Sequence, residues 1–444
     1  MKIGIYNYEG AELELIQDEA LLSESNSFTL VVGKNGIGKS RLISAIAKEL
    51  IQRYDYDYDD EEEPLVIAVS TSPFDKFPII SRFKLKNHSN FRYIGLRGDG
   101  SAFTSSSISL MSSAARGLLG GALHGNHGVS FLEVFASLHF RPRSTYMLKP
   151  VFDKATDEFK ATSEKEYFFV EPVESTGPIR VDKRYQAIFE ALETEEQSSV
   201  EYAMDHVASY YYSRKAIELE FNFVTSTAYI NGKKLPPYIL NSIVILMKLG
   251  LIRLMDLILE KENHGPISLR RASSGEQCLL IIMLGIAGHI RNGSVILIDE
   301  PEISLHPRWQ EEFMPMLISA FSKYSDCQFI VATHSPQIVS CATSEFSYVL
   351  ELESGVLHKS KDFNNKSADF QLAELFGAPG RMNEYVSRLG FDLIAKIRSR
   401  SKIDAEILDG LNRLLAFKPN LSSEDPVKKL IISVEELVSH YASH

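Results

Sequence analysis

The chain has 444 residues, of which 44% are hydrophobic and 24% are charged, a balance typical of a folded globular protein with two or three packed units. Its formal net charge of −11 excludes a protein that is basic overall, so DNA contact would need a local basic patch or a partner. Its three cysteines (Cys278, Cys327 and Cys341) have no paired spacing, which excludes a disulfide framework and a CxxC metal site.

No signal for export or for a membrane is visible. The opening MKIGIYNYEG lacks the basic and then apolar regions of a secretory signal. The most hydrophobic span, 243–260, is interrupted by Lys248, Arg253 and Asp256, and some of its charges recur at helical spacing. We therefore predict an amphipathic or buried helix there, no membrane contact, and a cytoplasmic protein.

The first hundred residues alternate between strand and helix patterns. Apolar positions at helical spacing predict a helix at 39–53, and the acidic run YDYDYDDEEEP after it is interpreted as a solvated loop. Short apolar runs bounded by polar turns predict strands at 2–8, 11–16, 28–32, 64–73 and 91–100.

The middle of the chain has a different character. A stretch rich in Ser, Gly and Ala begins near residue 99, and helical patterns dominate 182–217 and 236–262, with strand-like runs at 166–171 and 219–232. Strand and helix signals alternate again from 265 to 352, and the tail after 363 is mostly helical. No internal repeat or sustained heptad pattern is present.

The segment GKNGIGKS, residues 33–40, matches the pattern GxxxxGK[ST] between a predicted strand and a predicted helix. Glycines allow the backbone to wrap around phosphates, with amides and the helix N-terminus facing the anion. Lys39 would reach the β and γ phosphates, and the Ser40 hydroxyl would hold Mg²⁺. The residues predicted to contact nucleotide here are Gly33, Lys34, Asn35, Gly36, Ile37, Gly38, Lys39, Ser40 and Arg41.

A second motif, SVILIDEPE at 294–302, places Asp299 and Glu300 at the end of a buried strand. That end of an open α/β sheet is where ligands bind. Asp299 suits a contact to Mg²⁺, and Glu300 suits activation of the attacking water. An acidic pair alone could be a solvated strand end, so the prediction depends on its pairing with the Lys39 loop.

Two further segments have both a functional and an ordinary interpretation. The run SSGEQ opens a long apolar helix, so it is either a capped core helix or a phosphate-binding helix start. His334 ends the strand CQFIVATHSP and is either a structural histidine or a sensor of the γ-phosphate. The residues of the first segment predicted to contact nucleotide are Ser273, Ser274, Gly275 and Glu276.

The order GKNGIGKS, SSGEQ, VILIDEPE and ATHSP resembles that of an ABC-type ATPase head, over residues 1–80 and 265–355. The resemblance implies hydrolysis of ATP with Mg²⁺ between two subunits, with Lys39, Glu300 and His334 as catalytic residues. It also implies a homodimer or higher oligomer, in which Ser274 and Gly275 of one copy face the γ-phosphate held by the other. We predict an α/β fold: an N-terminal head lobe with antiparallel strands (1–98), a mostly helical insert (99–264), a C-terminal head lobe (265–362) and a helical tail for assembly or partner binding (363–444).

The chain departs from this family in one respect. ABC heads carry a glutamine after the strand that here reads VIAVSTSP, but no glutamine lies between Gln52 and Gln186. Ser70, Thr71 or Ser72 would stand in its place. The adenine contact is unassigned, since Tyr6 and Tyr8 are interpreted as packing residues.

The form DEPExxLHP, followed by Trp309 and a glutamine, resembles the SMC-like, RecF-like and OLD nuclease ATPases. We expect Trp309 to pack in the core. Residues 363–444 contain no DxD pair, so the TOPRIM nuclease of the OLD family is not expected there, and HGNHG (124–128) is interpreted as a plain loop.

The resemblance is greatest to ATPases of bacterial anti-phage systems, above all the Septu (PtuA) ATPases, with those of PARIS systems as near neighbours. It implies a separate nuclease subunit, of the HNH type or alternatively TOPRIM, and DNA contact through that complex. The alternatives are a RecF-like repair ATPase that binds DNA directly and, third, the ATPase subunit of a membrane transporter.

Overall fold

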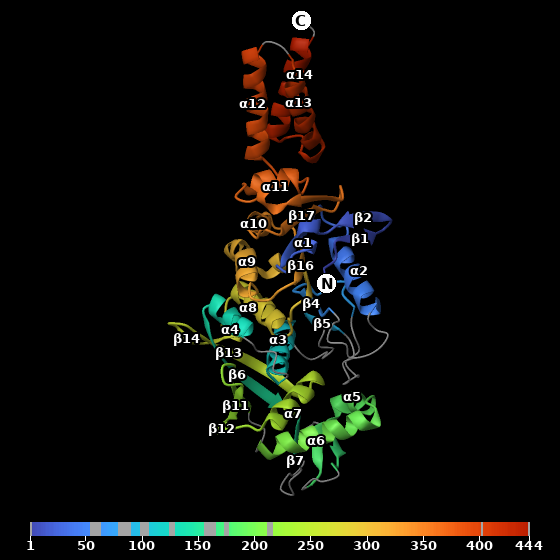
Figure 1. Ribbon diagram of the computed structural model, residues 1–444, viewed down its shortest axis with the longest axis vertical. Coiled ribbons are helices and arrows are strands. Elements are labelled where there is room, and N and C mark those ends of the chain that lie inside the picture. Colours follow the sequence, from blue (N-terminus) through green and yellow to red (C-terminus); the bar gives the residue numbers. More distant parts are fainter. Residues whose placement is uncertain are drawn as a thin grey trace.

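The computed structural model describes residues 2–53, 64–78, 90–97, 106–123, 129–154, 166–172, 177–210, 216–400 and 403–442. Its long axis runs from the insert, through a central α/β body, to a helical bundle at the C-terminal end (Figure 1). The predicted loops at 124–128 and, for the most part, the acidic run after residue 53 lie outside the described residues.

A seven-stranded sheet in the order β18-β17-β3-β16-β15-β4-β5 forms the central body. All neighbours pair in parallel except β18, which is antiparallel to β17. Both faces are buried, which explains why the strands read as continuous apolar runs. The strands are β3 (Ser27–Val32), β4 (Val66–Ser70), β5 (Phe91–Gly95), β15 (Val295–Asp299), β16 (Gln328–Ala332), β17 (Ser347–Glu351) and β18 (Val356–Lys359).

Helices cover the two faces of this sheet. Apolar side chains of α2 (Lys39–Arg53) pack on one face, against Val31, Val66 and Leu297. The alternate strand residues face the other way, into the core formed with α8 (Ser274–Ala287) and α9 (Pro307–Ala320). The sheet and the predicted helix at 39–53 are thus confirmed.

An antiparallel hairpin of β1 (Ile5–Tyr8) and β2 (Ala11–Glu14) forms the predicted N-terminal layer. Glu9 and Gly10 form its tight turn with φ of 51° and 85°, as hairpin turns with two positive φ angles require. The short helix α1 (Asp18–Leu21) connects this hairpin to β3.

The prediction of a mostly helical insert missed its main sheet. Six antiparallel strands in the order β12-β11-β10-β6-β13-β14 lie beneath the helices, and a separate three-stranded sheet has the order β7-β9-β8. The strands are β6 (Phe140–Pro150), β7 (Phe152–Lys154), β8 (Tyr167–Val170), β9 (Ile179–Asp182), β10 (Ile217–Asn222), β11 (Thr227–Ile230), β12 (Lys233–Lys234), β13 (Ile252–Lys261) and β14 (Gly265–Ser268). The helices are α3 (Ser106–Leu123), α4 (Val129–Ser137), α5 (Gln186–Glu190), α6 (Thr194–Tyr210) and α7 (Pro237–Lys248).

The single helix predicted within 243–260 is wrong. Helix α7 ends at Lys248, and β13 begins at Ile252. Gly250 separates them with φ of 77°, a conformation that glycine adopts without strain and that cannot continue a helix. Strand β13 pairs with β6, and it also pairs with β14 across the predicted boundary at 264 and 265.

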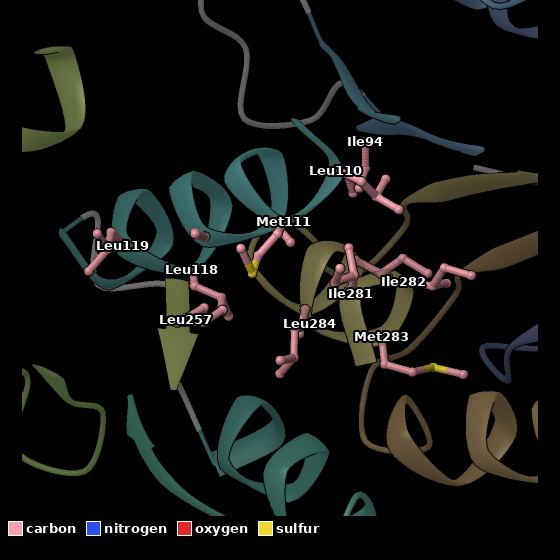
Figure 2. Packing of buried hydrophobic residues seen from close by; sticks show 14 of the residues in the cluster. Ile94, Leu110, Met111, Leu118, Leu119, Leu257, Ile281, Ile282, Met283 and Leu284 are labelled. Atoms are coloured by element: carbon pink, nitrogen blue, oxygen red, sulfur yellow. The ribbon is translucent and has the colours of Figure 1, made fainter. Parts of the chain in front are cut away.

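Helices α3 and α8 join the insert to the head. Apolar residues of both helices pack with Ile94 of β5 and Leu257 of β13 in one buried cluster (Figure 2). The approach is close, because a Cβ added to Gly288 would lie 2.4 Å from the carbonyl carbon of Gly117. The insert and the head therefore share one core.

The predicted helical tail is confirmed. In the tail, α11 (Ala368–Glu374) lies against α10 (Pro336–Ser340) of the head and is followed by α12 (Glu384–Arg400), α13 (Ala405–Phe417) and α14 (Pro426–Ala442). These last three pack on one another around a separate core that includes Ile397, Leu414 and Ile431 (Figure 1). In the part of the chain that is described, no helix is both long and apolar enough to cross a bilayer.

Candidate functional site

The glycine-rich loop at 33–40 connects β3 to α2 and has the backbone of a phosphate cradle. Gly33, Gly36 and Gly38 have φ of 145°, 82° and 115°, values that side chains with a Cβ rarely adopt. A Cβ at Gly38 would also lie 3.3 Å from the Tyr8 hydroxyl. The loop thus fits a polyphosphate, because bare glycines leave the backbone amides and the N-terminus of α2 open to the anion.

Lys39, the first residue of α2, is buried at the mouth of the loop, with 3% of its surface exposed. Its ammonium donates to the carbonyl of Gly33 at 2.9 Å and to that of Lys34 at 3.2 Å. Burial lowers its pKa to about 8, while the nearby carboxylates, Glu300 first, oppose the shift. A phosphate placed here would add negative charge and favour the protonated amine.

Ser40 and Asp299 form the pair predicted for the metal side of the site. The Ser40 hydroxyl donates to Asp299 Oδ1 at 2.9 Å, and Asp299 lies at the carboxyl end of β15 with 2% exposure. Burial raises the pKa of Asp299 to about 7, and Glu300, Asp75 and Glu302 add to the rise against the Ser40 hydrogen bond. A hydroxyl oxygen and a carboxylate oxygen, surrounded by further negative charges, are ligands that suit Mg²⁺.

Glu300 and His334 meet across the ends of β15 and β16. Glu300 has φ of 46° and ψ of 57°, a left-handed conformation uncommon for a glutamate and frequent at functional sites. His334 Nε2 lies 3.2 Å from Glu300 Oε1, and His334 Nδ1 lies 3.1 Å from the Lys39 ammonium. Since the ammonium can only donate, Nδ1 accepts, and the proton belongs on Nε2, which donates to Glu300. This hydrogen bond lowers the pKa of Glu300, so the carboxylate stays ionised.

A second glutamate holds the backbone of His334. Glu302 accepts a hydrogen bond from the His334 amide, and burial raises the pKa of Glu302. His334 is thus fixed at three points, by Lys39, Glu300 and Glu302. Sequence reasoning did not assign Glu302, although its place two residues after Glu300 in DEPE was a usable signal.

The segment predicted to replace the missing glutamine runs beside this site. The Thr71 hydroxyl donates to the main-chain carbonyl of Glu300 at 3.3 Å. Ser70 and Ser72 bond to each other instead, with the Ser72 amide donating to the Ser70 hydroxyl at 3.1 Å. Of the three candidates, Thr71 is therefore the one whose side chain contacts the main chain at the end of β15. Sequence reasoning missed Asp75, four residues further on.

The serine- and glycine-rich start of α8 lies against the segment that follows β15. Ser273 caps the helix by accepting from the Glu276 amide at 3.3 Å, and Glu276 pairs with Lys261 at 2.9 Å. A Cβ at Gly275 would lie 2.9 Å from Trp309 and 3.3 Å from the backbone nitrogen of His306. Trp309 is partly buried against the main core, in line with its predicted packing role. The start of this helix thus packs against residues 304–309. Its contact with the γ-phosphate held by a second copy stays a prediction.

Comparisons with known proteins bear on this geometry. Residues 157–340 match a family model described as "AAA domain, putative AbiEii toxin, Type IV TA system". The matched segment is similar to an ATPase domain. Within the match lie the α8 start, Asp299, Glu300 and His334, whereas Lys39 precedes it.

Two curated relatives resemble parts of this ATPase. The chain is 31% identical over 142 residues to the "Retron Ec83 probable ATPase" of Escherichia coli. This match covers 29% of this chain and 25% of that protein. The chain is 34% identical over 95 residues to the "Retron Vc95 probable ATPase" of Vibrio cholerae serotype O1 biovar El Tor, covering 19% and 18%. The chain therefore spans a quarter or less of the length of either relative.

Among solved structures, the SMC head domain from Thermotoga maritima matches with 17% identity, a TM-score of 0.19, and coverage of 32% of this chain and 66% of that one. A likeness this slight supports no argument about function.

Proposed function

We propose that the chain hydrolyses ATP as the regulatory ATPase of an anti-phage defence system. The observation that carries the hydrolytic part is the chain of contacts from Lys39 through His334 to Glu300, beside the Ser40–Asp299 pair. It supports the proposal because the Lys39 ammonium, an ionised carboxylate and a hydroxyl–carboxylate pair lie together at one edge of the sheet.

The reaction is an in-line attack of water on the γ-phosphate. Lys39 and the amides of residues 33–41 bind the phosphates and hold the γ-phosphate in line with the water. Ser40 and Asp299 would hold Mg²⁺, which neutralises charge on the β- and γ-phosphate oxygens when bound. Glu300 orients the attacking water and accepts its proton, which its lowered pKa permits. His334 keeps the Glu300 carboxylate ionised and aimed.

The working unit in this proposal is a homodimer or higher oligomer of heads. Ser274 and Gly275 lie at a helix start, where backbone amides and the helix dipole favour an anion. Gly275 packs closely against the segment after β15. In the proposal, the phosphate that this helix start meets belongs to the nucleotide of the second copy.

The defence role is supported by the two relatives, whose names couple an ATPase to retrons. Within that role we propose a separate nuclease subunit of the HNH type, as in Septu systems, or alternatively a TOPRIM protein, with DNA contacted through the complex. The helical bundle of α12–α14 has its own core and stands apart from the head, as a docking module for such a partner would (Figure 1).

Affinity purification of the tagged protein, expressed with its flanking genes, tests this proposal. Complexes are isolated with and without ATP, and co-purified proteins are identified by mass. Stoichiometric recovery of a small HNH protein would support the Septu-like assignment, and a TOPRIM protein would move it to the PARIS type. Recovery of a membrane permease would refute the defence role.

A second candidate, direct DNA binding of the RecF kind, is favoured by one basic cluster. Burial lowers the pKa of Lys248, at the end of α7, to about 8, and the nearby Arg92 of β5 and Arg116 of α3 add to this shift. Arg291 lies near Arg92 as well. If DNA phosphates bind there, affinity for double-stranded DNA falls steeply with salt, and replacing Arg116 by glutamine makes that dependence shallower. Binding that is insensitive to salt would refute this candidate.

A further inference from the structure

Asp75 is a buried carboxylate in the segment 70–78 that follows β4, and 2% of its surface is exposed. Arg97, just beyond β5, forms two hydrogen bonds with this carboxylate. Arg97 Nε donates to Asp75 Oδ2 at 3.1 Å, and Nη2 donates to Oδ1. The Tyr93 hydroxyl donates to the same Oδ2 at 2.7 Å. Such a two-pronged pair between Arg and carboxylate fixes both orientation and position.

The same contacts fix the surrounding backbone. Asp75 Oδ1 accepts from the Phe77 amide at 3.1 Å, and Arg97 Nη2 donates to the Phe77 carbonyl at 2.8 Å. On the other side, the Ser44 hydroxyl donates to the Lys76 carbonyl at 2.5 Å. The segment is therefore tied both to β5 and to α2.

These ties lead to the nucleotide site. Ser44 lies four residues after Ser40 on α2, so both point to one face of that helix. In the register of the sheet, Ser70 at the start of the segment pairs with Asp299, and Thr71 touches the Glu300 carbonyl. The charge of Asp75 is also felt at Asp299, where it helps to raise the pKa of that carboxyl.

We propose that Asp75 is a positioning residue of the nucleotide site, which with Arg97 fixes residues 70–78 between α2 and β5 and adds negative charge to the metal side. The inference rests on the proposed ATPase function and deepens it. Asp75 touches neither the phosphates nor the water in this assignment. It acts through Thr71, which holds the Glu300 main chain, and through its field at Asp299.

Loss of the Asp75 charge should weaken metal binding. Asp75→Asn removes a negative charge near the metal pair and leaves the positive charge of Arg97 behind, so a divalent cation binds more weakly. Looser support of Thr71 and Glu300 lowers the rate of the chemical step. The phosphate loop is unchanged, so the nucleotide itself should still bind.

The test compares the full-length wild type with three variants. Asp75→Asn removes the charge. Tyr93→Phe removes one hydrogen bond to Asp75 and leaves every charge in place. The matched control is Asp153→Asn, which breaks the partly buried Arg180–Asp153 pair between β7 and β9 in the insert.

Two measurements are made on each protein. Electron paramagnetic resonance of Mn²⁺ gives the metal affinity in the presence of a non-hydrolysable ATP analogue, and steady-state assays at saturating Mg²⁺ give kcat and KM for ATP. For Asp75→Asn we expect Mn²⁺ binding to weaken roughly tenfold and kcat to fall at least ~10-fold, with KM within about threefold, because only metal binding and the transition state are affected. For Tyr93→Phe, in which every charge stays in place, we expect kcat to fall about two- to threefold with Mn²⁺ affinity near that of the wild type, and for Asp153→Asn we expect no change in either.

Each outcome decides the matter. Unchanged Mn²⁺ affinity and kcat in Asp75→Asn would overturn the proposal, and so would losses matched by Asp153→Asn. If Asp75→Asn does not fold, Tyr93→Phe decides through the rate, and a wild-type kcat in that variant would overturn the proposal. If the wild type neither binds ATP nor hydrolyses it, the proposed function itself has failed, a result distinct from wild-type activity that Asp75→Asn leaves intact.

Discussion

Replacing Glu300 by glutamine tests the assignment of the catalytic base. The substitution keeps the size of the side chain, so the contact with His334 Nε2, now 3.2 Å from Glu300 Oε1, can still form with the amide oxygen. What is lost is the negative charge and the ability to accept a proton from water. Lys39 and the backbone of the phosphate loop are untouched, so ATP should still bind.

The size of the expected loss follows from the role. Positioned general bases contribute about 10²–10⁴ in rate, and a lost electrostatic contact in the transition state costs about 2.7–4 kcal/mol. We therefore expect hydrolysis by the Glu300→Gln variant to be at least ~100-fold slower, a rise of about 2.7 kcal/mol in the barrier.

Single-turnover hydrolysis of radiolabelled ATP measures this directly, and filter binding of ATP gives the affinity of the same protein. Glu312→Gln is the control, because Glu312 is a glutamate on α9 that forms an i,i+4 ion pair with the exposed Arg308. The variant Glu300→Gln should retain ATP that it cannot turn over. Hydrolysis at the wild-type rate would refute the role assigned to Glu300.

Three further predictions concern the metal, the core and pH. Ser40→Ala removes a ligand, so the Mg²⁺ concentration for half-maximal hydrolysis should rise roughly tenfold; an unchanged Mg²⁺ titration would contradict it. Gly288→Ala drives a Cβ to within 2.4 Å of Gly117, so urea unfolding should show a loss of about 1–3 kcal/mol. Gly120→Ala, whose Cβ meets only ordinary contact in α3, should instead stabilise by about 0.5–1 kcal/mol. Burial lowers the pKa of His289 from 6.5 to about 3. As the pH falls below 6.5, the unfolded state therefore binds a proton that the folded state does not. The free energy of unfolding should then fall by about 1.4 kcal/mol per pH unit because of this histidine. In urea unfolding, this appears as a steeper loss of stability in the wild type than in the His289→Gln variant.

The parts of the site that the sequence predicted are those in which local chemistry dictates local structure. Gly33, Gly36 and Gly38 take positive φ values that few other residues adopt, so their spacing alone defines the loop. The runs before Lys39 and around Asp299 are buried on both faces, so their continuous apolar pattern identified them as strands.

The parts that were missed depend on partners distant in sequence. Strand β13 is held by β6, more than 100 residues earlier, and no local signal distinguishes its apolar spacing from that of a helix. The role proposed for Asp75 depends on Arg97, which is 22 residues away and lies just beyond β5. Glu302 is likewise defined by the His334 amide, which only the adjacency of β15 and β16 brings to it.

The charges of the site explain why these distant partners matter. Asp299, Glu300 and Glu302 crowd the end of β15, and only Lys39 among the assigned nucleotide-binding residues opposes them from inside the site. Burial first, and then this crowding, raise the pKa of Asp299 to about 7. A divalent cation would displace that proton and relieve the crowding, so metal binding and proton release should be coupled. In this arrangement the negative charge of Asp75 strengthens the attraction of the site for a metal ion. The ion pair with Arg97 keeps Asp75 from being one more unpaired negative charge.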